Sequence, residues 1–432
     1  MARRRVPSYQ PEPRRVLMIT STYNRGGSER QMVATTAGLL KRGWDVQIMA
    51  FDSLQAGDAS FEEEILSLGI TPHLSSEFEV SSAPTLATES VALPRVFGTR
   101  LGAARAAIRH YRPSVVHGWL DDPAVVSGLA ACELGVPRVV IGQRNCCELL
   151  TIQDYPAEIL EELWHGYRSL STNPAVTILN NSGAGAAGYE HWLRLRRGTI
   201  RVLYNGYVPE WIREPAADEV RRFRASLGWR TDAPCVGCVM RFENYKDPDL
   251  WLDTAAEIAK LKPGVRFLLA GYGTMRDVII RRIETLGIGD RIVLPGPVSD
   301  VGLIYAAADV ILLTSLCEGV PNILMEAQAA GRPVVVTDFR TAREAVVHGR
   351  TGCIVPGRSA TRLAQATIAV LDDSSWAARA CIEGPAFVAS RFGLERMVSE
   401  TIDLYTTSRN SGCLVIPQQS AEVMNNRGML AG

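Results

Sequence analysis

Short apolar runs alternate with helical segments along most of this chain, and this alternation constrains the fold more than any other feature. In the first half, Val16–Ile19, Val46–Phe51 and Val139–Ile141 have the length and composition of buried strands, with amphipathic segments between them. The alternation ends near Asn205–Gly206 and restarts at Cys235–Met240. Alternating strands and helices are typical of parallel sheets covered by helices. The sequence therefore predicts an α/β protein with two Rossmann-like, doubly wound domains that face a cleft.

The restart of the pattern divides the chain into four parts. Residues 1–13 contain three consecutive arginines and three prolines and too little apolar content to fold, so we expect a disordered basic tail. The first Rossmann-like domain is assigned to 14–205 and the second to 206–405. Residues 406–432 are expected to form a loose C-terminal tail. A chain of 432 residues is long enough for two domains that each have a core.

The charge balance and the hydrophobic pattern exclude some partners. Forty-six basic residues balance forty-six acidic ones, so the chain as a whole gives no sign of a nucleic-acid partner. No apolar stretch reaches the roughly 18 residues of a membrane span, and the N-terminus lacks the apolar core of a secretory signal. A cytoplasmic protein is therefore expected. Arg3, Arg4 and Arg5 suggest weak peripheral contact with the cytoplasmic face of a membrane, as an alternative to a purely solvated tail.

The cysteines do not indicate a structural framework. Nine cysteines, an odd number scattered through a large chain, are typical of reduced thiols. Cys235 and Cys238 have the spacing of zinc ligands, but they lie within an expected strand and no second Cys-x2-Cys pair accompanies them. We interpret them as buried strand residues and expect no metal site.

The stretch Thr314–Ala330 holds the strongest candidates for chemistry. Glu318 and Glu326, eight positions apart, flank the start of a short helix that follows the apolar run Val310–Leu313. In strand-helix-strand units, ligands sit beyond the carboxyl ends of the strands, where helix N-termini offer free N–H groups to phosphate. Glu318 is then expected to line the cleft, with Glu326 about two turns into the helix. Without further signals, such a pair would be ordinary solvated surface charge.

The residues around both glutamates resemble the Glu-x7-Glu motif of the retaining glycosyltransferases of family 4. The matching residues are Glu318-Gly319-Val320-Pro321-Asn322, Glu326-Ala327 and Ala330-Gly331-Arg332-Pro333-Val334-Val335. The resemblance implies the glycosyltransferase B architecture over roughly residues 14–405 and transfer with retention of anomeric configuration. In the family, the first glutamate lies beside the transferred sugar and the second binds the ribose hydroxyls of the nucleotide. The resemblance thus assigns catalysis to Glu318 and donor binding to Gly319, Val320, Pro321, Asn322 and Glu326.

Two cations follow the expected strand Cys235–Met240 and face the same cleft. Arg241 and Lys246 suit a diphosphate, because arginine binds phosphate through two hydrogen bonds and lysine adds a point charge. Their Arg-x4-Lys spacing resembles the diphosphate-binding pair of the family. We expect both residues to act in catalysis by stabilising the negative charge that grows on the leaving phosphate. Because these groups can take the role of a metal, activity without a metal or other cofactor is expected.

Two further segments are assigned to donor binding. The loop with Gly26 and Gly27, between a strand and a helix, offers backbone N–H groups to a phosphate or sugar. Its order of strand, Gly-Gly-Ser-Glu and helix also resembles the start of the family. Glu344 follows a later strand, and most relatives carry two glycines where this chain has Arg340 and Thr341. Arg340 is interpreted either as a third cation of the site or as a solvated side chain.

Three residues of the first domain are candidate contacts of the acceptor or the sugar. His117 lies at an expected strand end, where many relatives have a His-x-His pair, but the second position here is Trp119. The active-site histidine of the family is therefore not matched, and a lone histidine at a strand end is more often structural. Trp119 offers a ring that could stack on a sugar. Arg144, at the end of the next strand, completes the set.

Together these patterns predict a hexosyltransferase. It would move a sugar from a UDP- or GDP-sugar in the second domain to a glycan or lipid-linked glycan in the first, in cell-surface polysaccharide or glycolipid synthesis. One alternative is a nucleotide-sugar epimerase or hydrolase of the same fold, which would turn over the donor without an acceptor. Another is a non-catalytic, two-lobed binding protein, which should lack the combination of Arg-x4-Lys and Glu-x7-Glu.

Overall fold

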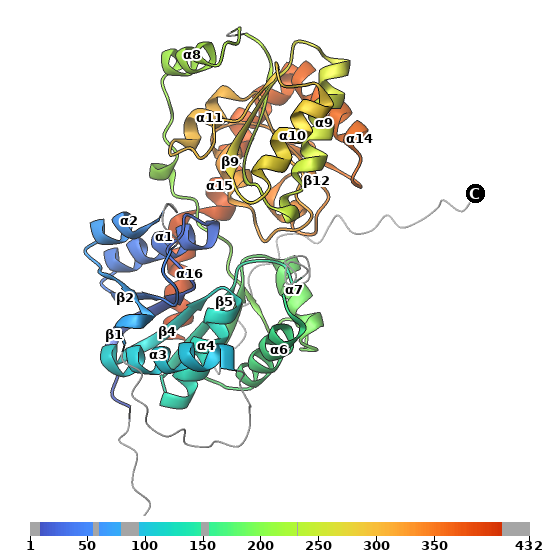
Figure 1. Cartoon of the computed structure of the whole chain (residues 1–432). Coiled ribbons are helices and arrows are strands. Elements are labelled where there is room, and N and C mark those ends of the chain that lie inside the picture. Colours follow the sequence, from blue (N-terminus) through green and yellow to red (C-terminus); the bar gives the residue numbers. More distant parts are fainter. Residues whose placement is uncertain (1–8, 55–59, 79–94, 148–154, 231, 408–432) are drawn as a thin grey trace, which may run out of the picture.

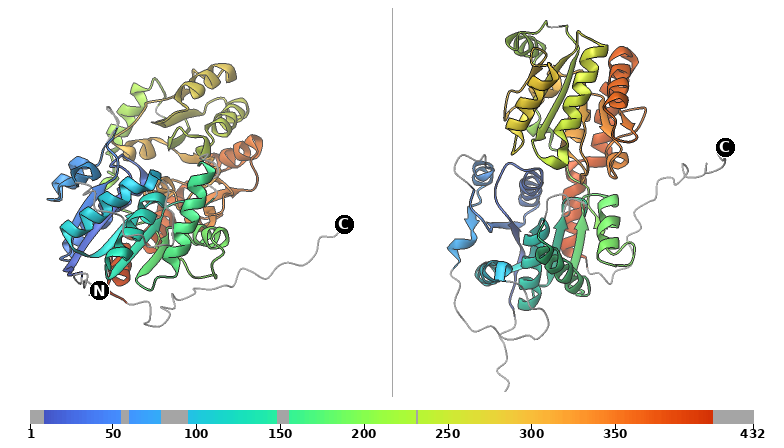
Figure 2. Two further views of the ribbon diagram at one scale, coloured as in Figure 1. Left: turned by 60° about the horizontal axis from the view of Figure 1, so that its bottom comes forward. Right: turned by 45° about the vertical axis from the view of Figure 1, so that its right-hand side comes forward.

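The protein has two lobes, each built on one parallel sheet (Figures 1 and 2). The computed structural model describes residues 9–54, 60–78, 95–147, 155–230 and 232–407. The predicted α/β class with two Rossmann-like domains is confirmed. Arg3–Arg5 and almost all of the predicted C-terminal tail lie outside the described residues. No described helix is long and apolar enough to cross a membrane.

The first lobe contains a seven-stranded sheet in the order β3-β2-β1-β4-β5-β6-β7. Its strands are β1 (Glu12–Thr20), β2 (Asp45–Ala50), β3 (Pro72–Leu74), β4 (Pro113–Trp119), β5 (Arg138–Gln143), β6 (Val176–Asn180) and β7 (Arg201–Val202). Its helices are α1 (Gly27–Lys41), α2 (Glu62–Ser67), α3 (Arg95–Tyr111), α4 (Asp121–Leu134), α6 (Ala157–Ser171) and α7 (Gly183–Trp192). The apolar half of β1, from Val16 to Ile19, is fully buried at the centre of this lobe.

The second lobe contains a six-stranded sheet in the order β10-β9-β8-β11-β12-β13. Its strands are β8 (Cys235–Arg241), β9 (Arg266–Tyr272), β10 (Ile292–Val293), β11 (Val310–Leu313), β12 (Val334–Thr337) and β13 (Gly352–Val355). Its helices are α8 (Ala217–Ser226), α9 (Pro248–Leu261), α10 (Arg276–Leu286), α11 (Val301–Ala307), α12 (Asn322–Ala329), α13 (Ala342–Ala345), α14 (Ala360–Asp372) and α15 (Ser374–Phe392). Cys235 and Cys238 are free and fully buried in β8, which confirms their interpretation as strand residues.

The strand order places both sets of candidate loops at topological switch points. In the second sheet, β9 and β10 lie on one side of β8, and β11 to β13 lie on the other. The loops after β8 and β11 therefore leave the sheet in opposite directions and open a crevice between them. In the first sheet, the same reversal occurs between β1 and β4. Ligands of doubly wound sheets bind at these points.

The last helix, α16 (Leu394–Thr406), returns to the first lobe (Figure 1). Met397, Val398 and Tyr405 are buried in the core that β1, β2 and α1 form. A Cβ atom on Gly38 of α1 would lie 2.2 Å from a methyl group of Val398, so this close approach requires glycine. The assignment of residues up to 405 to the second domain is therefore corrected for α16, because an apolar helix face does not reveal which core covers it.

Two crossings of the chain between the lobes lie side by side. The Tyr207 N–H donates to the Phe392 carbonyl at 2.6 Å, and Tyr207 forms a parallel bridge with Gly393. Arg396 of α16 donates to the carbonyls of Tyr204 and Asn205 at 3.1 and 3.3 Å. The outgoing and returning segments are thus held together by hydrogen bonds.

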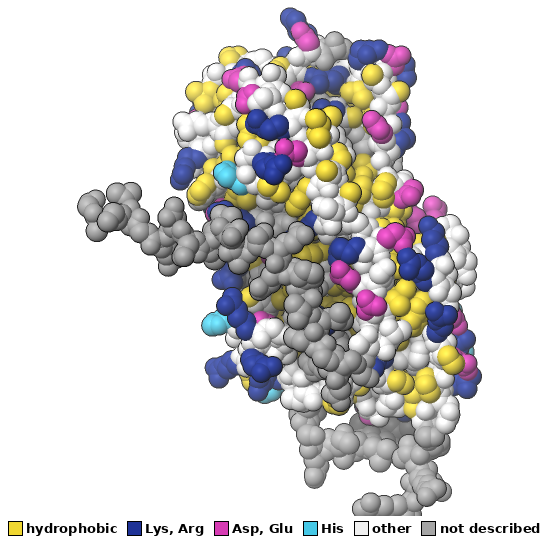
Figure 3. All heavy atoms as spheres, turned by 180° about the vertical axis from the view of Figure 1, so that it is seen from behind, with side chains coloured by type: hydrophobic (Ala, Val, Ile, Leu, Met, Phe, Trp, Pro, Cys, Tyr) yellow, Lys and Arg dark blue, Asp and Glu magenta, His cyan; other side chains and the backbone are white. Residues whose placement is uncertain are grey.

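The predicted N-terminal tail also needs correction, because β1 begins at Glu12 and not after residue 13. The Glu12 N–H donates to the Arg112 carbonyl at 2.7 Å, and Arg15 forms an ion pair with Asp45 at 2.5 Å. This end of the strand is polar and partly exposed, so hydrophobicity does not reveal it. On the back face, basic and acidic side chains are interspersed over both lobes, in agreement with the balanced net charge (Figure 3).

Candidate active site

Glu318 lies between β11 and α12, at the carboxyl end of the second sheet. Its carboxylate forms an ion pair with Lys246 and accepts a hydrogen bond from the Ser315 hydroxyl at 2.7 Å. The side chains of Glu318 and Lys246 are only 10% and 13% exposed, so little water screens their interaction. Burial alone would lower the pKa of Lys246, but the Glu318 carboxylate and the Tyr245 phenol together raise it above its ordinary value. Lys246 therefore stays charged. The structure brings these two predicted residues into direct contact.

Arg241, the other predicted cation, ends β8 and is exposed. Its guanidinium lies 5.7 Å from the centre of the Tyr272 ring on β9. Arg241 also lies close enough to Glu29 of α1 to lower the pKa of that carboxyl group. It therefore lies at the carboxyl edge of the second sheet and faces the first lobe.

Glu326 lies in the second turn of α12, and both of its carboxylate oxygens have partners. Arg30 of α1 donates to one oxygen at 2.5 Å, and the Tyr305 hydroxyl donates to the other at 2.5 Å. The Glu326 side chain is 9% exposed. In this conformation the predicted ribose-binding carboxylate is thus held by an ion pair between the lobes.

The start of α12 forms the junction between the lobes. A Cβ atom on Gly319 would lie 2.5 Å from Asn181 Oδ1 and 2.9 Å from the Arg144 carbonyl oxygen, so only glycine fits. Val320 and Pro321 are buried. The Asn322 side chain donates to the Gly27 carbonyl at 3.3 Å. These predicted donor contacts pack against the first lobe.

The Gly26–Gly27 loop caps α1. The first turn of this helix carries an ionisable group, Glu29, that sequence reasoning did not assign to the site. The Glu29 side chain folds back over this loop, and a Cβ atom on Gly26 would lie 2.2 Å from its Oε2. Glu29 is 5% exposed. Burial raises the pKa of Glu29 to about 7, although the hydrogen bond from its own N–H and the charge of Arg241 oppose this shift. Its carboxyl group therefore titrates near neutral pH.

Glu344, a predicted donor-binding residue, contacts the first lobe. Its carboxylate accepts from the N–H groups of Gly183 and Ala184 at 2.7 and 2.8 Å and from the Tyr204 hydroxyl at 2.9 Å. It thus caps α7 of the first lobe, where a helix N-terminus attracts negative charge. In this conformation its contacts thus come from the first lobe, and the assignment of Glu344 to donor binding stays a prediction.

The two residues that replace the glycines of relatives have separate places. The Thr341 hydroxyl lies 3.1 Å from the Glu318 carbonyl oxygen and 2.6 Å from that of Gly319, which fixes the loop that carries Glu318. Arg340 is exposed. Both interpretations of Arg340 therefore remain.

The three candidate acceptor contacts form one cluster in the first lobe. His117 lies inside β4, with Nδ1 2.7 Å from the Tyr405 hydroxyl of α16. Burial and the charge of Arg144 hold the pKa of His117 well below its ordinary range, so the ring is neutral. Trp119 is fully buried, and its ring contacts both His117 and the Arg144 guanidinium, 4.0 Å from the ring centre. Neither ring is exposed to stack on a sugar in this conformation.

The two halves of the chain match two family models. Residues 25–211 match the model described as Glycosyltransferase Family 4, and residues 219–384 match the one described as Glycosyl transferases group 1. The chain belongs to the family 4-like glycosyltransferases of the B fold. The predicted family is thereby confirmed.

Relatives of this glycosyltransferase include one that is named for polysaccharide biosynthesis. The Vi polysaccharide biosynthesis protein VipC/TviE of Salmonella typhi is 28% identical over 416 residues, which are 89% of this chain and 70% of that protein. The D-inositol 3-phosphate glycosyltransferase of Corynebacterium urealyticum is 28% identical over 240 residues. That match covers 54% of this chain and 56% of the relative, so this chain spans little more than half of that protein.

Solved glycosyltransferases share the fold at low identity. A crystal structure of HepE from Anabaena with UDP and glucose has a TM-score of 0.73 at 18% identity and covers 90% of this chain and 98% of its own. WaaG, a glycosyltransferase involved in lipopolysaccharide biosynthesis, has a TM-score of 0.66 at 16% identity. That match covers 91% of this chain and 100% of the WaaG chain. Both chains are covered almost throughout, so the likeness extends over both lobes.

No metal centre is evident in the part of this glycosyltransferase that the structure describes. Groups of three or more His, Cys, Asp or Glu residues that could hold a metal ion are absent among the described residues. The sequence carries one Asp-x-Asp, at Asp247-Pro248-Asp249. Asp247, however, caps α9 by accepting from the Leu250 N–H at 3.0 Å and forms an ion pair with Arg358.

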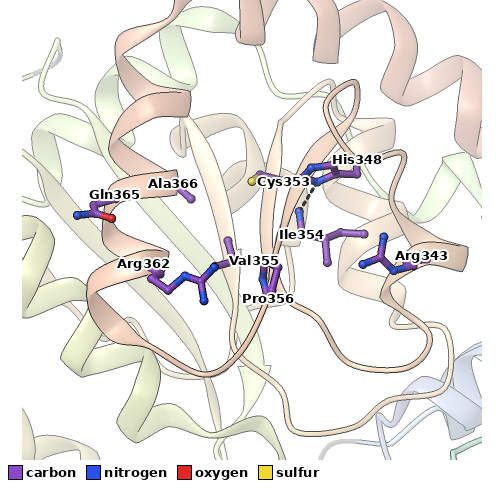
Figure 4. A pocket seen from close by; sticks show the side chains of 9 residues that line it. All are labelled: Arg343, His348, Cys353, Ile354, Val355, Pro356, Arg362, Gln365 and Ala366. Carbon is purple, nitrogen blue, oxygen red and sulfur yellow. Dashed lines mark hydrogen bonds between the residues drawn. The ribbon is translucent and has the colours of Figure 1, made fainter. Parts of the chain in front are cut away.

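A separate pocket lies at the edge strand β13 of the second sheet (Figure 4). It is lined by Arg343, His348, Cys353, Ile354, Val355, Pro356, Arg362, Gln365 and Ala366. His348 Nδ1 accepts from the Ile354 N–H at 3.0 Å, which satisfies a backbone donor of this edge. None of the predicted site residues lines this pocket.

Sequence reasoning missed several residues that contact the predicted ones, among them Glu29, Arg30, Asn181 and Tyr305. Asn181 directly follows β6, so the rule that ligands bind beyond strand ends could have identified it. Arg30 and Glu29 follow the Gly-Gly loop and carried a weaker signal. Tyr305 lies in the middle of α11, and nothing in its local sequence indicates its contact with Glu326.

Proposed function

We propose that this glycosyltransferase moves a hexose from a UDP- or GDP-sugar to a glycan or lipid-linked glycan, with retention of anomeric configuration, in surface polysaccharide or glycolipid synthesis. UDP-glucose is the first donor to test, since crystal structures of the similar HepE contain UDP, UDP and glucose, or UDP-glucose. The relative that covers most of this chain is named for polysaccharide biosynthesis. These names support the proposal for the donor and the pathway.

The observation that carries the proposal is the shielded ion pair of Glu318 and Lys246 at the carboxyl end of the second sheet. A donor diphosphate would compete with Glu318 for the Lys246 ammonium group. Glu318, once released, could accept a hydrogen bond from a hydroxyl of the transferred sugar. The pair thus offers one group to the phosphate and one to the sugar, as transfer between them requires.

The same site suits the departure of a diphosphate. Negative charge grows on the leaving phosphate as the glycosidic bond breaks, and Lys246 is fixed beside it. Arg241 and the N-terminus of α12 add positive potential. Glu326 would accept from the ribose hydroxyls once Arg30 moves away. We propose that these groups make a bound metal unnecessary.

The decisive experiment measures thermal stabilisation of the purified protein by a panel of UDP- and GDP-sugars. A ligand that binds only the folded state raises the melting temperature. One nucleotide sugar should do so in the parent and in Lys260→Met, which alters an exposed lysine with a 70% exposed side chain. Lys246→Met should lose most of the shift.

Turnover with the identified donor then separates the alternatives. Release of free nucleotide should require an added glycan acceptor. Equal release without any acceptor would identify a hydrolase, and conversion of one nucleotide sugar to another would identify an epimerase. Stabilisation by none of the nucleotide sugars would contradict the proposal.

A further inference from the structure

The carboxyl ends of β4 and β5 carry a cluster of shielded hydrogen-bond donors. Trp119 Nε1 and Arg144 Nη2 are both removed from solvent, and no described residue accepts a hydrogen bond from them. Buried donors in folded proteins are nearly always paired, because an unpaired buried group loses its hydrogen bond to water. A cluster of unpaired donors therefore indicates a place for a ligand that accepts hydrogen bonds.

The cluster also carries a positive charge that the described residues do not balance. Arg144 donates to the neutral Asn205 side chain at 3.1 Å and lies over the Trp119 ring. Burial lowers the pKa of Arg144 to about 9, and the one group that opposes this shift is the Tyr405 phenol. Arg144 is half-buried, with its Nη2 atom removed from solvent, and shielding a cation without a counter-charge is costly to the folded state.

The carboxylate of Asp121, which contacts the neighbouring residue Asn145, is already engaged elsewhere. Asp121, which follows β4, accepts from the hydroxyls of Tyr167 and Tyr189 at 2.9 and 2.8 Å and from the Asn145 amide at 3.2 Å. Asp121 does not contribute to the pKa shift of Arg144, and Arg144 does not contribute to the pKa shift of Asp121. The missing acceptor would therefore come from outside the described chain.

The position of the cluster connects it with the proposed reaction. The Arg144 carbonyl and the Asn181 side chain contact Gly319, the residue after Glu318. A group bound at Arg144 would lie on the first-lobe side of the junction, across from the residue that we place beside the transferred sugar. That is the side from which an acceptor must approach.

We propose that Arg144, with the indole N–H group of Trp119, binds an anionic group of the acceptor, a carboxylate or a phosphate close to the hydroxyl that receives the sugar. This inference rests on the proposed function and narrows the acceptor to negatively charged glycans. A bidentate hydrogen bond to a planar carboxylate or to phosphate suits a guanidinium group, and a neutral hydroxyl would leave its charge unbalanced. The ligand would enter when the lobes separate at the Gly319 contact.

The test compares three small probes of similar size: methyl glucoside, methyl glucuronide and glucose 6-phosphate. Their binding to the full chain is measured by ligand-observed nuclear magnetic resonance in a buffer without phosphate. The parent should bind at least one anionic probe about tenfold or more tightly than the neutral glucoside. Preference for the glucuronide identifies a carboxylate, and preference for the sugar phosphate identifies a phosphate.

Variants then locate the binding site. Arg144→Gln should lose the preference for the anion and Arg144→Lys should keep part of it, whereas Arg105→Gln, which removes a surface ion pair with Glu133, should behave like the parent. Because no described carboxylate balances the charge of Arg144, Arg144→Gln should not lower the melting temperature. Replacement of an arginine with a purely structural role would lower it.

Two outcomes overturn the inference. Equal binding of neutral and anionic probes by the parent would show that the cluster does not select an anion. Loss of anion binding in Lys246→Met but not in Arg144→Gln would place the anion at the donor cations. Failure of the proposed function is recognised separately, because stabilisation by nucleotide sugars does not depend on Arg144.

Discussion

Under the proposed function, the ion pair of Glu318 and Lys246 would serve both stability and chemistry. Removing one partner of a buried ion pair leaves the other charge unbalanced, which costs about 3–5 kcal/mol. Truncation of either residue would therefore mix loss of folding with loss of function. Glu318→Gln keeps the shape of the side chain and its hydrogen bond with Ser315, so it tests the charge alone.

The two glutamates should affect different kinetic constants. Glu326→Ala should mainly raise the KM for donor, because the ribose does not react and its binding is shared by ground and transition states. Glu318→Gln should lower kcat by about ten- to 150-fold, the equivalent of one charge-assisted hydrogen bond. Steady-state kinetics with varied donor, and circular dichroism as a folding check, measure both effects. If both folded variants transferred sugar like the parent, the Glu-x7-Glu assignment would be wrong.

Glu29 predicts an unusual pH dependence of stability. Its pKa is raised from 4.5 to about 7 in the folded state, so folding favours the protonated form. The contribution of Glu29 to the free energy of unfolding should be fully present below about pH 4.5 and should be lost as the pH rises from there through 7. The loss amounts to about 3 kcal/mol, at about 1.4 kcal/mol per pKa unit. Glu29→Gln should remove this loss. We expect the variant to melt close to the parent at pH 5 and above it at pH 8, and equal melting temperatures at pH 8 would refute the assignment.

Among helices, strands and loops, the sequence predicted the positions of the elements better than the side-chain contacts between them. Periodicity identified β8, β11 and β12, and the rule for strand ends placed Arg241, Lys246 and Glu318 at one edge. It could not show that Glu344 caps α7, because that contact joins residues about 160 positions apart. Nor could it show that His117 and Trp119 lie inside β4, since apolar runs mark only the buried centre of a strand.

The Glu344 cap should hold the first turn of α7. Glu344→Ala removes the acceptor of two backbone N–H groups, and loss of a cap costs about 0.5–2 kcal/mol. Hydrogen exchange measured by mass spectrometry should therefore become faster in the peptide that contains Gly183 and Ala184. Glu395→Ala, at a position with a 73% exposed side chain, is the matched control and should leave that peptide unchanged. Unaltered exchange in Glu344→Ala would show that the cap contributes nothing.

At the scale of the whole molecule, contacts from both lobes converge on α12. From the first lobe, Arg30 and Gln31 reach α12 and Asn181 reaches the loop before it. From the second lobe, Tyr305 reaches α12 and Thr341 reaches the preceding loop. Donor binding must therefore rearrange contacts between lobes as well as side chains within one. The positive groups at this junction are the basis for expecting catalysis without a metal.

Transfer should accordingly persist in excess chelator. The expected result is a rate within about twofold of the untreated enzyme, since Lys246, Arg241 and the N-terminus of α12 would stabilise the leaving phosphate. The assay follows acceptor-dependent release of nucleotide with and without EDTA. Loss of most activity, restored by magnesium or manganese, would show that a metal takes part.

The two chain segments that join the lobes lie next to each other, and this determines how the second lobe is inserted into the chain. Because Tyr207 leaves the first lobe beside Phe392, where the chain returns, the second lobe is an insertion into a domain that is completed by α16. Its two ends are adjacent, as in a module that can be exchanged as one piece. If the second lobe binds the donor as proposed, a chimaera that gives this enzyme the donor preference of a relative should be joined near residues 207 and 392, with α16 taken from the same parent as the first lobe.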